Sequence, residues 1–266
     1  MGAGYALWHQ PGEHGMLTPE QARQHAALMA EHLQGPDGAR LFDRPLAYHG
    51  GLQRLFQRGE SSSFFGREIG IMYTHAHLRH AQMLAHLGDA EGLLDALRKA
   101  HPIHMREHVP CAAPRQANCY FSSSDAAFAD RPEADRRYGD AIAGRVPLEG
   151  GWRIYSSGPG LFIAIFVRSF LGLRAAARTL TVDPVLPPAM NGLVATVELW
   201  GTPVEVEYAG AGVPGAAASV TLNGAALPWT REHNPYRIGG LQVPREAFEA
   251  ALQPGPQRMQ VTLDAG

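Results

Sequence analysis

The chain has 266 residues, enough for one large domain or two small ones. Hydrophobic residues make up 45% of it and charged residues 18%, which excludes a disordered chain because a packed core can form. The formal net charge is −2 and no block of Lys or Arg occurs, which excludes a nucleic-acid-binding surface. Two cysteines, Cys111 and Cys119, are too few for a disulfide framework and favour thiols in a reducing compartment.

Neither a signal peptide nor a membrane-spanning segment is recognisable in the sequence. The first fifteen residues lack the basic and apolar stretches of a signal peptide. The longest apolar run, from Leu161 to Val167, is followed by Arg168 and is too short to cross a bilayer. We therefore expect a soluble, cytoplasmic protein that associates with a membrane only through a region upstream of this chain.

Helical signals dominate the first two thirds of the chain. The first predicted helix begins at Pro19, with Thr18 as N-cap and Gln21 completing a capping box, and it ends before Gly35–Pro36. Further helices are predicted over residues 68–87, 90–100, 132–143 and 159–172. Helices of this length, joined by long loops, favour a helical barrel or a layered helical domain over a compact bundle.

Strand signals replace the helical ones from Thr179 onward. Short runs of alternating apolar and polar residues follow one another, and Asn223–Gly224 is a typical hairpin turn. A short helix is predicted over residues 245–252. The fold class is therefore α+β, with a helical domain over residues 1–175 and a small antiparallel β-sandwich over residues 176–266.

Glu68 and His75 are the first candidate site residues. Seven residues separate them, which on one continuous helix is two turns and places both side chains on the same face. Such a pair suits a sugar hydroxyl on the carboxylate and an anion on the imidazole. The alternative is structural: an acid that complements the helix dipole and a hydrogen-bonded core histidine.

Two further stretches have the residue types of a sugar-phosphate site. Ser157 and Gly158 precede an apolar helix, where backbone N–H groups and a hydroxyl can bind an anion, although an ordinary N-cap explains them as well. Gln116 and Asp125 lie in a polar segment with aromatic residues, as in many sugar sites; the alternative is a solvated loop.

The numerous histidines raise the question of a metal site. His75, His77, His80 and His86 are close in sequence, but no HExxH pattern occurs, and His77 faces away from His75 on a helix. A zinc site needs three or four convergent ligands. No metal ligand is therefore assigned.

Five segments together resemble glycoside hydrolase family 94, in particular its branch of cyclic β-1,2-glucan synthase C-terminal regions and 1,2-β-oligoglucan phosphorylases. Cellobiose phosphorylases are more distant relatives. The segments follow in order along nearly the whole chain: GREIGIMYTHAH (66–77), QANCYFSSSDA (116–126), GGWRIYSSGPG (150–160), LGLR followed by DPVLP (171–174 and 183–187), and NPYRIGG (234–240).

The resemblance implies an (α/α)6 barrel followed by a jelly-roll-like β domain, of which this chain would hold the C-terminal part of the barrel and the β domain. It also implies that Glu68 contacts sugar and that His75, Ser157 and Gly158 bind phosphate, with Ser157 where the cellobiose enzymes have Thr. No cofactor is implied; inorganic phosphate is a co-substrate. The implied reaction is inverting phosphorolysis, in which one carboxylic acid protonates the glycosidic oxygen and phosphate attacks the anomeric carbon.

The general acid of the family is the main departure. In the family this aspartate lies upstream of the region matched here, and Asp125 occupies a different part of the pattern, so no catalytic residue is assigned in this chain. We expect the chain alone to be inactive and to need an upstream enzyme half, or a second copy, to cover exposed helix faces. Two alternatives remain: a non-catalytic carbohydrate-binding or assembly subunit, and a helical-barrel hydrolase that uses water.

Overall fold

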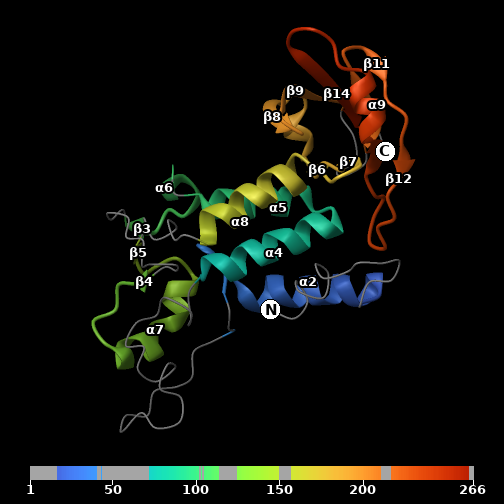
Figure 1. The fold of residues 1–266 in the computed structure, drawn as a ribbon. Helices are drawn as coiled ribbons and strands as arrows, with labels where there is room; N and C mark the ends of the chain where they lie inside the picture. Colours follow the sequence, from blue (N-terminus) through green and yellow to red (C-terminus); the bar gives the residue numbers. More distant parts are fainter. Residues whose placement is uncertain are drawn as a thin grey trace. The chain divides into compact units, whose positions relative to one another are not determined.

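A computed structural model of the chain describes residues 17–40, 43, 72–101, 103, 105–113, 125–149, 157–210 and 217–263. The fold is mixed α+β, as predicted (Figure 1). The described residues divide into two compact units. The first comprises residues between 20 and 83 and between 95 and 163, and the second comprises residues 17–19, 84–94 and those from 164 onward.

The helices follow most of the sequence signals. The first described helix, α2, spans Pro19–Leu33 and has the predicted bounds. Helix α5 spans Ala90–Ala100, again as predicted. The other helices of this part are α4 (Thr74–Leu87), α6 (Met105–His108), α7 (Arg131–Ile142) and α8 (Ser157–Ile165).

Helix α7 begins with a reciprocal cap. The Asp130 carboxylate accepts a hydrogen bond from the Glu133 N–H at 2.8 Å, and the Glu133 carboxylate accepts one from the Ala129 N–H at 2.8 Å. Two backbone donors that the helix itself cannot satisfy are thereby paired. The cap fixes the start of this helix within one residue of the predicted position.

Helix α4 begins six residues later than predicted. Met72 forms a β-bridge with Arg40, and the Met72 N–H donates to the Asp37 carboxylate at 3.3 Å. These contacts to residues more than thirty positions away hold the backbone before Thr74 out of the helix. The prediction that one continuous helix joins Glu68 to His75 is therefore wrong, and Glu68 itself lies outside the described residues.

Helix α8 continues into a π-helical turn, Phe166–Phe170, before the chain enters the β strands. The Leu171 N–H donates to the Phe166 carbonyl at 2.8 Å, the five-residue spacing that defines such a turn. Gly172 then adopts φ +70° against the backbone of Asp183. Because a side chain would neither tolerate this angle nor fit there, Gly172 ends the helix close to its predicted end.

Small sheets and an apolar cluster complete the first unit. Strands β1 (Gln34–Gly35) and β2 (Gly38–Ala39) form a hairpin, and a second small sheet has the order β3–β5–β4. Its strands are Ala112–Ala113, Leu148–Glu149 and Asp125–Ala126. The core cluster beside this sheet consists of Met72, Met105, Val109, Ala112, Ala134, Ala141, Val146 and Leu148.

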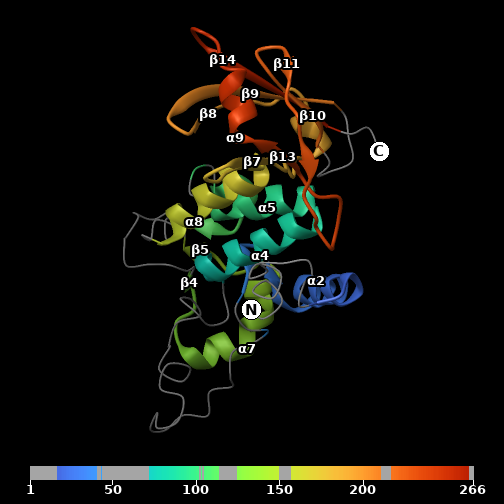
Figure 2. The same cartoon turned by 45° about the vertical axis from the view of Figure 1, so that its right-hand side comes forward.

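Two larger sheets make up most of the second unit (Figure 2). The four-stranded sheet has the order β12–β13–β7–β6, with strands Thr230–Arg231, Leu241–Pro244, Thr179–Val182 and Leu173–Ala175. The five-stranded sheet has the order β11–β10–β14–β9–β8, with strands Ala225–Ala226, Ala217–Leu222, Gln257–Leu263, Thr202–Ala209 and Val194–Leu199. A short helix, α9, spans Arg245–Ala250, inside the predicted range.

The structure agrees with the strand and turn predictions in this unit, with one exception. Along β9, Val204, Val206 and Tyr208 are buried and the residues between them are exposed, which is the alternation of a half-buried strand. Asn223 and Gly224 have φ 52° and 82° and form the predicted hairpin turn between β10 and β11. The prediction of a purely antiparallel sheet is wrong for one pair, because β14 runs parallel to β9.

Candidate functional site

The predicted site residues are described to different extents. His75 is the second residue of α4, and Ser157 is the first residue of α8, followed by the buried Gly158. Asp125 is the first residue of β4, where its backbone pairs with Glu149. Glu68 and Gln116, like the side chains of Asp125 and Ser157, lie outside the described part of the structure. The sugar-binding predictions thus stay predictions.

His75 lies in the first turn of α4 with its ring partly exposed. The Tyr73 ring is 6.4 Å away, centroid to centroid, and tilted by 44°. Burial, and next the positive charge of Arg79, lower the pKa of His75 below its usual value. The lowered pKa favours the neutral imidazole, which offers one N–H donor and one acceptor. A neutral imidazole can therefore donate a hydrogen bond to an anion through its N–H group.

The starts of α4 and α8 lie at the same end of the first unit (Figures 1 and 2). Helix α4 contacts the C-terminal half of α5, and α8 contacts the residue that follows α5. The His77 Nε2 atom is 2.7 Å from the Ala96 carbonyl oxygen, and the rings of His101 and Phe162 are 5.7 Å apart. The tertiary structure thus brings His75 and the Ser157–Gly158 turn, 82 residues apart, to two helix N-termini at one end, where N–H groups and dipoles favour an anion.

The neighbouring histidines serve the fold. The buried His77 accepts a hydrogen bond at Nδ1 from the Ala39 N–H at 2.9 Å, so its Nε2 carries the proton that is donated to Ala96. His80 is also buried and contacts the Gln34 side chain at 2.5 Å. Among the described residues no group of three or more His, Cys, Asp or Glu side chains is arranged to hold a metal ion.

Gly38 explains why His77 fits so closely. This glycine has φ +131°, and a Cβ atom added to it would lie 2.7 Å from the His77 ring nitrogen. A residue with a side chain would therefore clash with the ring and strain the backbone. The contact identifies His77 as part of the packing between the β1–β2 hairpin and α4, which is the structural alternative considered for the histidines of this stretch.

The second unit contains a buried cluster of charges that sequence reasoning did not identify as such. The Asp183 side chain is 5% exposed and accepts hydrogen bonds from Arg174 at 3.0 Å and from both terminal nitrogens of Arg237 at 2.7 and 2.9 Å. Arg174 also pairs with Glu232. The signal was present in three of the motifs that carry the family resemblance, LGLR, DPVLP and NPYRIGG, but their side-chain pairing is not readable from spacing.

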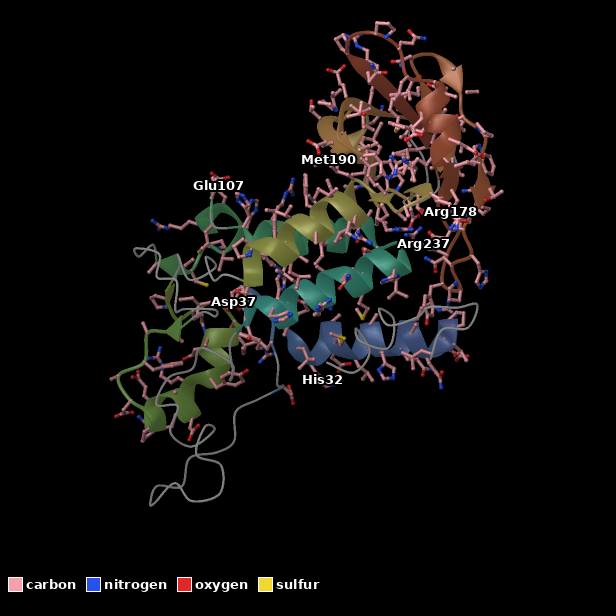
Figure 3. The ribbon with its side chains drawn as sticks, in the orientation of Figure 1. His32, Asp37, Glu107, Arg178, Met190 and Arg237 are labelled. Carbon is pink, nitrogen blue, oxygen red and sulfur yellow. The ribbon has the colours of Figure 1, made fainter. Side chains whose placement is uncertain are left out.

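This cluster also caps the last turn of α4. Arg237 Nε donates to the Ala85 carbonyl at 3.2 Å, and the Asn234 amide donates to the His86 carbonyl at 3.4 Å (Figure 3). A cation at a helix C-terminus is favoured by the dipole. Burial first, and then the charges of Arg237 and Arg174, lower the pKa of His86 to about 4. The motif NPYRIGG therefore has a structural role here.

Cys111 is a free thiol, and burial raises its pKa above the usual value. A thiol of this kind is mainly protonated and unreactive at neutral pH. Cys119 lies outside the described residues. None of the helices in the described part of the chain is long and apolar enough to cross a membrane.

Comparison with known proteins gives two matches. Residues 172–260 match the family model described as the glycoside phosphorylase C-terminal domain. Over 233 residues, or 87% of this chain, the sequence is 40% identical to a 1,2-beta-oligoglucan phosphorylase of Listeria innocua, and the match covers 21% of that protein. The chain thus spans about a fifth of the length of this relative. The resemblance to glycoside phosphorylases is confirmed, and the chain is homologous to the C-terminal portion of a 1,2-beta-oligoglucan phosphorylase.

Proposed function

We propose that this chain supplies the C-terminal portion of an inverting β-glucan phosphorylase, which cleaves β-1,2-linked glucosides with inorganic phosphate and releases glucose 1-phosphate. The identity of 40% over 233 residues to a 1,2-beta-oligoglucan phosphorylase carries the proposal. Two helix N-termini at one end of the first unit support it, because backbone N–H groups and helix dipoles at such ends favour a phosphate anion.

The proposed roles divide the chain's residues between phosphate and sugar. His75, Ser157 and Gly158 bind phosphate through an imidazole N–H, a hydroxyl and a backbone N–H. Glu68, Gln116 and Asp125 contact sugar hydroxyls. The carboxylic acid that protonates the glycosidic oxygen comes from outside these 266 residues, and phosphate forms the new bond to the anomeric carbon as the old C–O bond breaks.

The proposed architecture is a part of an (α/α)6 barrel over residues 1–175, followed by a jelly-roll-like β domain over residues 176–266. Apolar side chains on the first unit support a further covering element. Leu28 on α2 is 53% exposed and Ile163 on α8 is 60% exposed. Large exposed apolar patches mark surfaces that another segment covers. Leu28 and Ile163 are proposed to belong to such a surface. The upstream enzyme half, or a second copy of this chain, is the proposed cover.

Product identity tests the proposal. The purified 266-residue chain, given β-1,2-gluco-oligosaccharides and phosphate, is expected to form no glucose 1-phosphate. A chimera in which this chain replaces the matching part of the Listeria innocua relative is expected to form it. Turnover by the chain alone would contradict the missing-acid proposal. Free glucose formed by the chimera without phosphate would indicate a hydrolase, and glucan binding without any product would indicate a carbohydrate-binding subunit.

Matched histidine variants locate the phosphate function within the chimera. His75→Ala is expected to raise the KM for phosphate by about 10-fold or more, since one donor to an anion is lost. His32→Ala, a change at an exposed histidine of α2, is expected to leave both KM and kcat unchanged. Equal behaviour of the two variants would remove His75 from the proposed site.

A further inference from the structure

The first residue of α4, Thr74, carries a buried hydroxyl that makes no hydrogen bond within the described part of the chain. Its side chain is almost fully buried, with 2% of the residue exposed. Among the residues that the structure describes, none exchanges a hydrogen bond with its Oγ1 atom. Burying a hydroxyl without a partner costs free energy, and nearly all such groups in native proteins are paired with protein, water or ligand. The hydroxyl therefore points to a further partner.

The position of Thr74 favours an anionic partner. The Cα–Cβ bonds of a helix tilt toward its N-terminus, so the Thr74 hydroxyl is directed to the end where the first backbone N–H groups of this 14-residue helix also point. His75 is the next residue, and the Arg79 cation lies one turn farther along, near the His75 ring. The start of α4 thus offers backbone donors and the helix dipole, with the His75 ring and the Arg79 cation on its first two turns.

Two polar side chains of this region, Asp37 and His77, are engaged elsewhere. The Asp37 carboxylate, which Figure 3 labels near the start of α4, accepts the N–H of Met72, two residues outside the helix. The imidazole of His77 binds Ala39 and Ala96 with its two nitrogens. Neither side chain bonds to the Thr74 hydroxyl. The hydrogen bonds of Asp37 and His77 are thus accounted for by the packing of the first unit, whereas the Thr74 hydroxyl has no partner among the described residues.

We propose that the Thr74 hydroxyl is a ligand of the phosphate co-substrate, donating a hydrogen bond to an oxygen of the anion held at the start of α4 beside His75. The inference rests on the proposed function, because it completes the phosphate site assigned there to His75. A sugar hydroxyl is the less suitable ligand, since a neutral group gains little from the helix dipole and the Arg79 charge.

The role of Thr74 is tested by measuring how the 266-residue chain binds inorganic phosphate. Calorimetric titration gives the affinity, and the phosphate-induced rise in melting temperature gives an independent measure of binding. Thr74→Val keeps the shape of the side chain and removes the hydroxyl; it is expected to weaken phosphate binding by about 10-fold or more. Thr74→Ser keeps the hydroxyl and is expected to stay within about 3-fold of the parent. The exposed-site variant His32→Ala should bind as the parent does.

The structural alternative predicts a different result. If Thr74 only supports the fold, Thr74→Val lowers the melting temperature equally with and without phosphate, and the inference is wrong. Our expectation is that this variant melts at the parent temperature, or above it, without phosphate and loses the phosphate-induced rise. If Thr74→Val does not fold, Thr74→Ala gives the same comparison in the chimera, as a raised KM for phosphate with an unchanged KM for glucan.

Three outcomes separate this inference from the proposed function. Normal phosphate binding by Thr74→Val, together with loss of binding by His75→Gln, overturns the role of Thr74 and leaves the proposed function standing. Stabilisation by a β-1,2-gluco-oligosaccharide that depends on Thr74, without a response to phosphate, overturns it as well. So does the absence of phosphate binding by the parent chain, in which case the products of the chimera decide the proposed function independently.

Discussion

The two ends of helix α4 differ in whether their polar groups are hydrogen-bonded within the described part of the protein. At the last turn, the carbonyls of Ala85 and His86 accept hydrogen bonds from Arg237 and Asn234. At the first turn, the Thr74 hydroxyl makes none within the described part of the chain. Charged and polar side chains gather at both ends, but only those of the last turn are fully used by the fold. The difference separates polar groups that stabilise the protein from those that remain for a ligand.

The cluster around Asp183 is an example of polar groups that stabilise the protein. A buried carboxylate held by two guanidinium groups has its desolvation cost offset only while both partners remain. Its members come from four different segments of the second unit, so the cluster joins strands, the NPYRIGG loop and the helix end. No described member is left for a substrate, and we therefore assign the cluster to stability.

The largest expected effect is at Arg237. Arg237→Ala leaves the buried Asp183 with one cationic partner and uncaps the end of α4, so we expect it to lower the free energy of unfolding by about 3–5 kcal/mol. Arg258→Ala, at an exposed arginine paired with Glu205, is the control and should change it by less than about 0.5 kcal/mol. Urea denaturation measures both. Equal changes in the free energy of unfolding for the two variants would show that the buried cluster stabilises the protein no more than an exposed ion pair does.

A smaller loss is expected at His77. His77→Leu removes the partner of two buried backbone groups, the Ala39 N–H and the Ala96 carbonyl, and should cost about 2–4 kcal/mol in the same denaturation experiment. Phosphate binding per folded molecule should be unchanged. A stable His77→Leu protein with lost phosphate binding would move His77 from the structural group to the site.

Acid should destabilise the protein through His86. Its pKa is about 4 in the folded state, below the usual 6.5, so the unfolded chain binds the proton more readily and stability falls as the pH decreases from about 6.5 to about 4. Between pH 7.5 and 5 this loss is about 2 kcal/mol. In His86→Gln that part of the pH dependence should be absent. An identical stability-versus-pH curve for parent and variant would contradict the assignment.

The smallest effect on stability is expected at His75. None of the described hydrogen bonds uses its ring, so His75→Gln should change the free energy of unfolding by less than about 0.5 kcal/mol. We expect the variant to change phosphate affinity instead. A loss of stability as large as that of His77→Leu would assign both histidines to the core and remove the contrast between the two ends of α4.

Local signals in the sequence determined most element bounds and the class of the fold. The helix start at Pro19, the turn at Asn223–Gly224 and the alternation along β9 depend on the backbone of neighbouring residues, so they are readable without the fold. The motifs also carried the resemblance to glycoside phosphorylases, which the matches over residues 172–260 and over 233 residues confirm.

Only the tertiary structure decided where polar groups find partners. The start of α4 depends on Asp37 and Arg40, which contact Met72. Strand β14 pairs in parallel with β9. The burial of Asp183 depends on two arginines that are far apart in sequence. The Thr74 hydroxyl became a candidate ligand only because the described residues offer it no partner, which spacing cannot reveal. The physical reason is that a hydrogen bond or ion pair is set by distance in space, whereas caps, turns and amphipathic patterns are set by distance along the chain.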